Sequence, residues 1–251
     1  MHSEKQYIDL YRECREQICA HSAAPLNAVR DAAFEQFERQ GFPSRKVERY
    51  KYTSVDELFA PDYGVNVNRL EIPVDPYKAF RCDVPNLSTS LYFIVNDQFR
   101  AALQPKENLP EGVVVDSLAA YAQANPQFVA DHYAQLAHAD EDGITALNTM
   151  LAQDGLLVYV KRGVKVDRTI QVINILRSDV PLMVNRRVLI VMEEGAEAKL
   201  LFCDHAADDR EFLATQVIEA YVGRNASLDL YCMDETHYKN TRVSKVYICL
   251  V

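Results

Sequence analysis

The residues with the clearest chemical potential lie in the tripeptide Cys203-Asp204-His205. If this tripeptide belongs to a β-strand, the alternation of side chains places Cys203 and His205 on one face. A thiolate and an imidazole are ligands that iron and zinc accept, so these two residues are candidate metal ligands. Two ligands do not complete a site, and Cys232 or His237 would have to supply the rest. The alternative is that the cysteine is buried as a small hydrophobic residue.

The other cysteines and the acidic residues give no further site. The six cysteines are scattered and form no Cys-x-x-Cys pair, which disfavours a zinc knuckle and a dense disulfide framework. The acidic residues between 204 and 211 fit a solvated loop better than a catalytic carboxylate pair; they are Asp204, Asp208, Asp209 and Glu211. The sequence contains no GxGxxG, GxxxxGK[ST], HExxH or GxSxG motif. We therefore predict no catalytic residue and no ATP hydrolysis by the chain itself.

The charge balance argues against a nucleic-acid partner. The formal charge is −9 and the isoelectric point is near 5.2, so the protein as a whole repels polyphosphates. The strongest basic cluster, Arg45, Lys46, Arg49 and Lys51, is diluted by Glu48, and we interpret it as a solvated or partner-facing segment. The sequence shows neither a secretory signal nor the roughly 18 apolar residues of a membrane span. A cytoplasmic location without membrane contact is expected.

The first part of the chain predicts mainly helices. Apolar residues at intervals of three and four predict an amphipathic helix over residues 4–20. A second helical pattern runs from Leu26 to Phe37, and Gly41 stands where a left-handed C-terminal cap is expected. Further helices are expected over 117–124, 127–137 and 144–153.

Two shorter features lie between these helices. Ser54 and Glu57 have the spacing of a capping box and predict the start of a short helix. A hairpin is expected over residues 91–103, because Asn96-Asp97 separates two apolar runs and tolerates positive φ.

Beyond Gly155 the sequence repeats itself. Three turns begin with Gly163, Gly195 and Gly223, at spacings of 32 and 28 residues, and each lies between two runs rich in β-branched residues. A fixed unit stacked on itself is the economical explanation of such spacings. We therefore predict a parallel β-helix, with a plain antiparallel sandwich as the alternative.

Two stretches resemble the SufD family, the β-helix subunits of the SUF iron–sulfur cluster assembly machine. Residues 41–53, with the sequence GFPSRKVERYKYT, are similar to the family's run of a proline, a basic pair, an acidic residue and an aromatic-Lys-Tyr-Thr. The family usually has tryptophan where Tyr50 stands, and this chain has no tryptophan. Residues 146–156, with the sequence ALNTMLAQDGL, look like the family's entry into its β-helix.

The resemblance implies an α+β N-terminal region over residues 1–154, followed over 155–251 by the start of a right-handed parallel β-helix that is truncated. It implies a non-catalytic scaffold that pairs with a SufB-like β-helix subunit and a SufC-like ATPase. An iron–sulfur cluster would form transiently between the subunits, and no cofactor is assigned to this chain itself. The family's ATPase-docking helices and its iron-linked residues lie in the C-terminal half, beyond Val251, so no catalytic residue is carried over.

Other functions remain as alternatives. One is a β-helix enzyme that acts on polysaccharide or on an acyl donor, although the sequence shows neither a convincing carboxylate cluster nor the six-residue repeat of left-handed acyltransferase coils. Another is a structural protein with a β-coil. On the scaffold interpretation, the last coil leaves an open edge, and unpaired strand edges invite aggregation.

Overall fold

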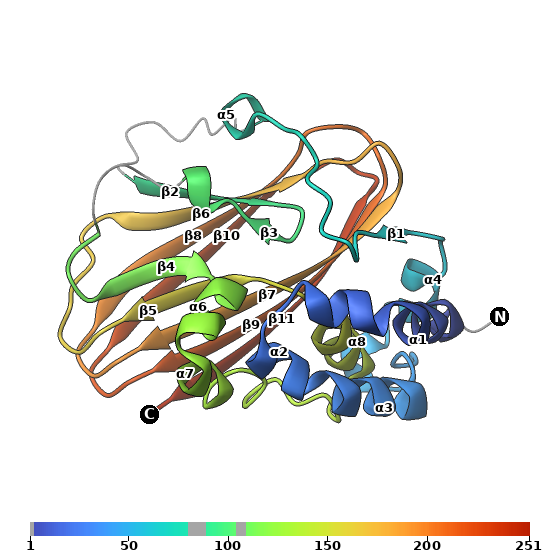
Figure 1. Ribbon diagram of the computed structural model, residues 1–251, viewed down its shortest axis with the longest axis horizontal. Coiled ribbons are helices and arrows are strands. Elements are labelled where there is room, and N and C mark those ends of the chain that lie inside the picture. Colours follow the sequence, from blue (N-terminus) through green and yellow to red (C-terminus); the bar gives the residue numbers. More distant parts are fainter. Residues whose placement is uncertain (1–2, 80–88, 104–108) are drawn as a thin grey trace.

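The computed structural model describes residues 3–79, 89–103 and 109–251. Seven strands after Gly155 wind into a coil with two faces (Figure 1). Strands β5, β7, β9 and β11 belong to one sheet and β6, β8 and β10 to the other. Their bounds are β5 Leu156–Val160, β6 Thr169–Leu176, β7 Leu182–Met192, β8 Glu197–Ala206, β9 Phe212–Val222, β10 Ser227–Glu235 and β11 Asn240–Leu250.

Neighbouring strands within this coil pair in parallel. Thr215 on β9 lies opposite Asn185 on β7, and Ser227 on β10 lies opposite Glu197 on β8. Each coil of about 30 residues therefore returns the chain to the same place, one strand further along the stack. The parallel β-helix predicted from the repeats is confirmed, and the antiparallel sandwich is wrong.

The repeated turns depend on one residue with positive φ in each coil. Gly163 has a φ of 70° and Gly195 a φ of 69°. In the third coil this position is held by Asn225, with a φ of 57°, because asparagine also tolerates the left-handed region. Gly223 serves a different need, since a Cβ there would lie 2.8 Å from the backbone nitrogen of Glu194. The spacing of 28 residues was therefore counted between Gly195 and Gly223, which have different roles in their turns.

The main apolar core lies between the two sheets. Inward-facing side chains of both sheets meet there, and complete burial of each contributes about 1.5–3 kcal/mol. Fully buried members of this core include Val158, Ile170, Val172, Ile190, Leu200, Phe202 and Ile218. Intervening residues on β5 and β7, such as Leu157 and Leu189, belong to a second cluster that packs beneath the helices. Strands β5, β6, β7 and β9 are thus buried on both faces, which explains their nearly continuous apolar character.

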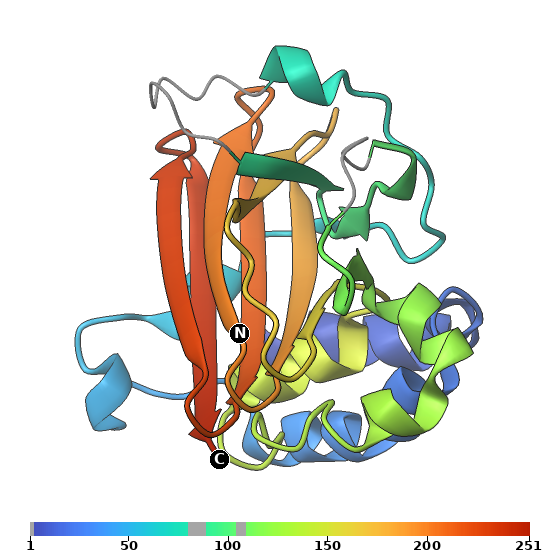
Figure 2. The same ribbon diagram turned by 90° about the vertical axis from the view of Figure 1, so that its left-hand side faces the viewer.

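Helices from the first part of the chain gather on one side of this stack (Figure 2). The predicted helix over residues 4–20 is confirmed as α1, and it buries Tyr7, Tyr11 and Ile18. The second helical pattern divides at Val29 into α2 and α3, and α3 ends at Gly41, whose φ is 60°. The bounds are α1 Glu4–Ala20, α2 Ala24–Ala28, α3 Arg30–Gln40, α6 Leu118–Ala124, α7 Pro126–Ala130 and α8 Gly143–Leu151.

Strands that precede Gly155 extend both sheets. The predicted hairpin is present as β2 and β3, with Asn96 at a φ of 58°, and β2 pairs in parallel with β6. Its second arm is shorter than predicted, because β3 ends at Phe99 and residues 101–103 form a 3-10 turn. Strand β4 pairs with β5 and β1 pairs with β7. Their bounds are β1 Gly64–Val65, β2 Thr89–Val95, β3 Gln98–Phe99 and β4 Val113–Ser117. The division at residues 154 and 155 stays a prediction, because both regions contribute strands to the same sheets.

Two local predictions need correction. The helix expected over 127–137 ends at Ala130, because the backbone N–H groups of Ala134, Leu136 and Ala137 donate to the carboxylate of Glu219 instead. Ser54 does precede a helix, but its side chain makes no capping hydrogen bond. The remaining short elements are η1 Glu48–Tyr50, α4 Val55–Phe59, α5 Pro76–Ala79 and η2 Ala101–Leu103. Within the described ranges, no helix has the length and apolar character needed to cross a membrane.

The last coil leaves part of its interior uncovered. Val246, Ile248 and Leu250 occupy the positions on β11 that continue the interior rows of β9, yet they are 49%, 56% and 79% exposed. Strands β10 and β11 each pair on one side only within the described part of the chain. Apolar side chains beside unpaired strand edges can pack against further β-structure, of this polypeptide or of another.

We expect replacement of Gly155 by alanine to destabilise the junction between helix α8 and the coil. A Cβ at Gly155 would lie 2.2 Å from the carbonyl oxygen of Arg187, so the backbone must shift. Overpacking of this kind costs about 1–3 kcal/mol or more, and thermal denaturation measures it. Gly64→Ala is the matched control, since its Cβ would meet Pro181 at an ordinary 3.4 Å. Equal melting temperatures for the two variants would contradict the close packing at Gly155.

We expect the 251-residue chain by itself to self-associate at micromolar concentration, because the uncovered row on β11 is apolar. Ile248→Lys should shift size-exclusion elution from aggregates toward the monomer. Tyr238→Lys removes a more exposed aromatic residue outside this row and should leave the elution unchanged. A monodisperse wild-type monomer would show that the exposed row does not drive association.

Candidate functional site

The structure places both candidate metal ligands on the outer face of the second sheet. Cys203 packs with Phe93, Ile173 and Leu201 in a cluster separate from the coil interior. Its sulfur lies 3.4 Å from Nε2 of Gln171. His205, two residues further along β8, has Nδ1 3.4 Å from a carboxylate oxygen of Glu235. The predicted alternation of Cys203 and His205 is thus present.

The two residues considered as completing ligands lie elsewhere. Cys232 sits opposite Phe202 in the register, on the side of β10 that faces the coil interior, and Met233 is the residue opposite Cys203. His237 lies in the turn after β10, where its ring packs 4.2 Å from the ring of Tyr238. Among the residues that the structure describes, no three His, Cys, Asp or Glu side chains form a group able to hold a metal ion. Metal binding by Cys203 and His205 therefore stays a prediction.

Asp204 is buried inside the coil rather than exposed in a solvated loop, which corrects that interpretation for this residue. Its carboxylate receives hydrogen bonds from Arg186 on β7 and from Arg242 on β11. Arg186 also donates from Nε to the carbonyl oxygen of Asn96, at 2.8 Å. The coil interior is therefore polar where β8 ends and β7 begins, although it is apolar near the glycine turns.

A completely enclosed ion pair lies on the outer face of the first sheet. Nη2 of Arg187 lies 2.6 Å from Oε2 of Glu219, and both side chains have no exposed surface. Arg187 also donates to Thr149 on α8 at 3.0 Å, and its guanidinium lies 4.6 Å from the ring centroid of Tyr133. The carboxylate of Glu219 accepts three backbone N–H groups from residues 134–137. The pair therefore joins β7 and β9 to helix α8 and to the loop after α7.

The environment of Glu219 determines its protonation. Burial alone would raise the pKa of this carboxyl group, because it disfavours the charged form. The positive charge of Arg187 and the three backbone donors outweigh burial and hold the pKa below its usual value. Glu219 is thus ionised at neutral pH, and the buried charges compensate each other.

The stretch 146–156 that resembles the SufD family holds this junction together. Asn148 donates from Nδ2 to the carbonyl oxygen of Arg186 and to Thr215, and Gln153 donates to the carbonyl oxygen of Val67 at 2.8 Å. Asp154 accepts hydrogen bonds from the hydroxyl of Ser117 at 2.7 Å and from the backbone of residue 119 at 3.0 Å. The polar residues of this motif are therefore structural, and they fix the first helical region against the coil.

The other family-like stretch, residues 41–53, contacts the last strand. The hydroxyl of Tyr50 donates to Asp142, and Nζ of Lys245 on β11 lies 3.0 Å from the same carboxylate. The ammonium group of Lys245 also lies 4.6 Å from the ring centroid of Tyr50. Burial and the hydrogen bond to Asp142 raise the pKa of the Tyr50 phenol, so it remains a protonated donor. The aromatic position of the motif thus joins the N-terminal region to β11.

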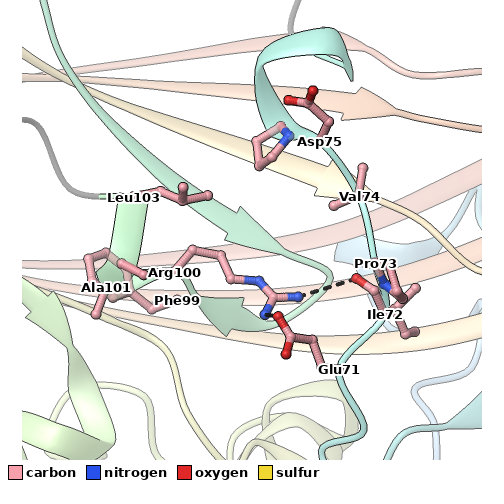
Figure 3. A pocket seen from close by; sticks show the side chains of 11 residues that line it. Glu71, Ile72, Pro73, Val74, Asp75, Phe99, Arg100, Ala101 and Leu103 are labelled. Atoms are coloured by element: carbon pink, nitrogen blue, oxygen red, sulfur yellow. Dashed lines mark hydrogen bonds and ion pairs between the residues drawn. The ribbon is translucent and has the colours of Figure 1, made fainter.

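A surface hollow of about 690 Å³ lies between residues 71–76 and the end of β3 (Figure 3). Arg100 reaches across it and donates to the carboxylate of Glu71 at 2.9 Å and to the carbonyl oxygen of Ile72 at 3.4 Å (Figure 3). Among its lining residues that the structure describes there is no Ser, Cys or His, so these residues supply no nucleophile with an adjacent base. The charge of Arg100 is already neutralised by Glu71.

Comparison with known proteins assigns the chain to a family. The model of the SufBD protein N-terminal region matches residues 1–172, and the model of the SUF system FeS cluster assembly SufBD core domain matches residues 174–250. The chain belongs to the SufBD family. Iron-sulfur cluster assembly protein SufD of Bacillus subtilis (strain 168) is 24% identical over 249 residues, which cover 95% of this chain and 55% of that protein. The chain is thus SufD-like and spans about half the length of this relative.

Membership of the SufBD family places the chain in the SUF system of iron–sulfur cluster assembly. The boundary between the two family models falls after β5 and inside β6, within the coil itself. Sequence reasoning missed the Arg187–Glu219 pair of this SufBD chain. The available signal was a charged residue inside each of two otherwise apolar strands, because such a charge is buried only when it is paired.

We expect Glu219→Gln to destabilise this SufBD chain by about 3–5 kcal/mol, because it leaves the Arg187 charge buried without a counterion. Chemical denaturation measures the loss. Glu194→Gln is the control, since its ion pair with Arg162 is exposed and is worth at most about 1 kcal/mol. Similar losses in both variants would mean that the buried pair contributes no more than a surface pair.

The same pair predicts an acid limb in the stability profile. The folded pKa of Glu219 is lowered from its ordinary value of 4.5, so its contribution is complete above that value and is lost as the pH falls through the folded pKa. Glu219→Gln should therefore flatten the decline in unfolding free energy below about pH 4.5. An unchanged slope would assign the acid sensitivity to other carboxylates.

Proposed function

We propose that this chain is a non-catalytic scaffold in iron–sulfur cluster assembly, which acts together with a SufB-like β-helix subunit and a SufC-like ATPase. The cluster is the cargo of the assembly and forms transiently at the interface between subunits. Residues of the SufBD chain supply a rigid parallel coil and its attached helices rather than reacting groups.

The observation that carries this proposal is the match of two SufBD family models along the chain, onto a coil whose pairing is parallel throughout. A coil of this kind holds its outer surfaces at fixed spacing and orientation, as a scaffold must.

Native mass spectrometry of the endogenous protein, purified gently from its own cells, tests the proposal. We expect the chain to carry two further components, an ATPase and a second β-helix subunit, and ATP hydrolysis to accompany the complex rather than the isolated chain. A tagged Gly64→Ala bait should retain both components, and a Gly155→Ala bait, which is destabilised at the junction, should recover less of them.

Recovery of the chain alone from several gentle preparations would contradict the scaffold proposal, provided that the Gly64→Ala bait also carries no partner protein. Turnover of uronate-containing polysaccharide or of acyl-CoA by the purified protein would instead favour the enzyme alternative.

A further inference from the structure

A strongly basic surface lies on the N-terminal region. Residues 44–53, here called the basic segment, lie between α3 and α4 and are exposed except for Tyr50. The basic segment contains Arg45, Lys46, Arg49 and Lys51 against the single acid Glu48. Four cations within ten residues contrast with the formal charge of −9 for the chain.

The charges of the basic segment are largely unused by the fold. Within the described part of the chain, Arg45, Lys46 and Arg49 form no ion pair, and Lys51 lies 3.9 Å from Glu48. Some other surface cations are paired, as Lys165 is with Glu197 at 2.6 Å. The cations at 45, 46 and 49 are therefore available to a partner without loss of an internal contact.

The basic segment is held in one conformation. Backbone N–H groups of Val47, Tyr50 and Thr53 donate to the carbonyl oxygens three residues earlier, at 3.0, 2.8 and 2.9 Å. The buried ring of Tyr50 fixes these turns to Asp142 and to Lys245. A surface that is ordered before binding loses less conformational entropy when a partner docks.

The segment also presents apolar surface among its cations. The side chain of Tyr52 is 91% exposed and that of Val47 is 46% exposed, and Nζ of Lys51 lies 5.6 Å from the Tyr52 ring centroid. At the base of the segment a hollow of about 460 Å³ is lined in part by Phe42, Val47 and Arg49. Tyrosine and arginine are enriched in protein interfaces, where an aromatic ring and a guanidinium group supply much of the binding energy.

We propose that the basic segment docks an acidic surface of a partner protein. The arginines and lysines meet carboxylates of that partner, and Tyr52 and Val47 bury against its apolar side chains. We favour a protein over a nucleic acid for two reasons. The net charge of −9 opposes the dense charge of a polyphosphate chain more strongly than the few carboxylates of an acidic protein patch. The exposed side chains of Val47 and Tyr52 also offer apolar surface that a folded partner buries. This inference names a surface and a partner chemistry that the scaffold proposal does not specify.

Zero-length cross-linking tests the contact in the protein isolated with its native partners. A water-soluble carbodiimide joins lysine amines to carboxylates that touch them, and mass spectrometry locates the linked residues. The internal link from Lys51 to Glu48 serves as the positive control for the reagent. We expect Lys46 to be linked to aspartate or glutamate residues of a second, identified protein. Lys46 left unlinked, or linked only within its own chain, while the control link forms would overturn the inference.

Charge reversal supplies the second measurement. Arg45→Glu with Lys46→Glu should reduce recovery of the cross-linked protein at least about tenfold, because like charges then oppose each other across the interface. The matched control is Lys161→Glu with Arg224→Glu, which makes the same change in net charge on exposed turns of the coil and should alter recovery less than about twofold. Equal losses in the two double variants would show a general charge effect and overturn the inference.

Further outcomes separate the possible partners. Binding of polyuridylate RNA or of phosphatidylglycerol vesicles that is lost in the Arg45→Glu, Lys46→Glu variant, with no protein link at Lys46, would overturn the inference in favour of a polyanion or a membrane. If a SufB-like subunit and an ATPase co-purify while Lys46 remains unlinked, the inference fails and the scaffold proposal stands. A link from Lys46 to an acidic protein without those subunits supports the inference and contradicts the scaffold proposal.

Discussion

The ion pair between Arg187 and Glu219 is the interaction on which the arrangement of helices and coil depends. Both charges are fully removed from water, and the cost of this desolvation is offset only because the two charges are paired and most of their donors and acceptors have partners. Helix α8, the loop after α7 and two coil strands supply those partners together. If the helices moved away from the coil, Arg187 and Glu219 would lose hydrogen-bond partners while they remain among apolar side chains. The helices and the coil therefore form one packed unit.

The coil divides its polar groups between two environments. Its interior is apolar near the glycine turns and contains the Asp204 carboxylate between two arginines at the other end. Hydrophobic burial supplies most of the stabilisation. It does not by itself fix the register between strands, because the strands carry apolar side chains on both faces. Hydrogen-bonded charges fix a single register, because a shift by one residue would turn Arg186 and Asp204 to the outside and bring Arg187 into the interior. The two buried charge clusters, one inside the coil and one outside, thus oppose slippage of the same strand.

Local patterns predicted the coil and its helices well, and long-range pairing explains where they did not. The glycine turns and β-branched runs were sufficient to predict the parallel β-helix, because each coil repeats a turn with one residue of positive φ between two strands. The choice of Gly223 over Asn225 as the repeated residue failed because two residue types satisfy positive φ. Residues 131–137 have helical composition, yet they turn toward a carboxylate more than eighty positions later. Cys232 fell on the wrong face for a site with Cys203, since the register between β8 and β10 is not visible in either strand alone.

The contact of Lys245 with Tyr50 and Asp142 has a consequence for synthesis of the chain. Tyr50 and Asp142 of the N-terminal region thus contact a residue on β11 that lies 195 and 103 positions later. As the polypeptide leaves the ribosome from its N-terminus, the early helices emerge long before the strands that complete their surroundings. Glu219 and Lys245 must both be translated before the helices can pack fully against the coil. The helices of the N-terminal region are therefore completed late, although they are made first.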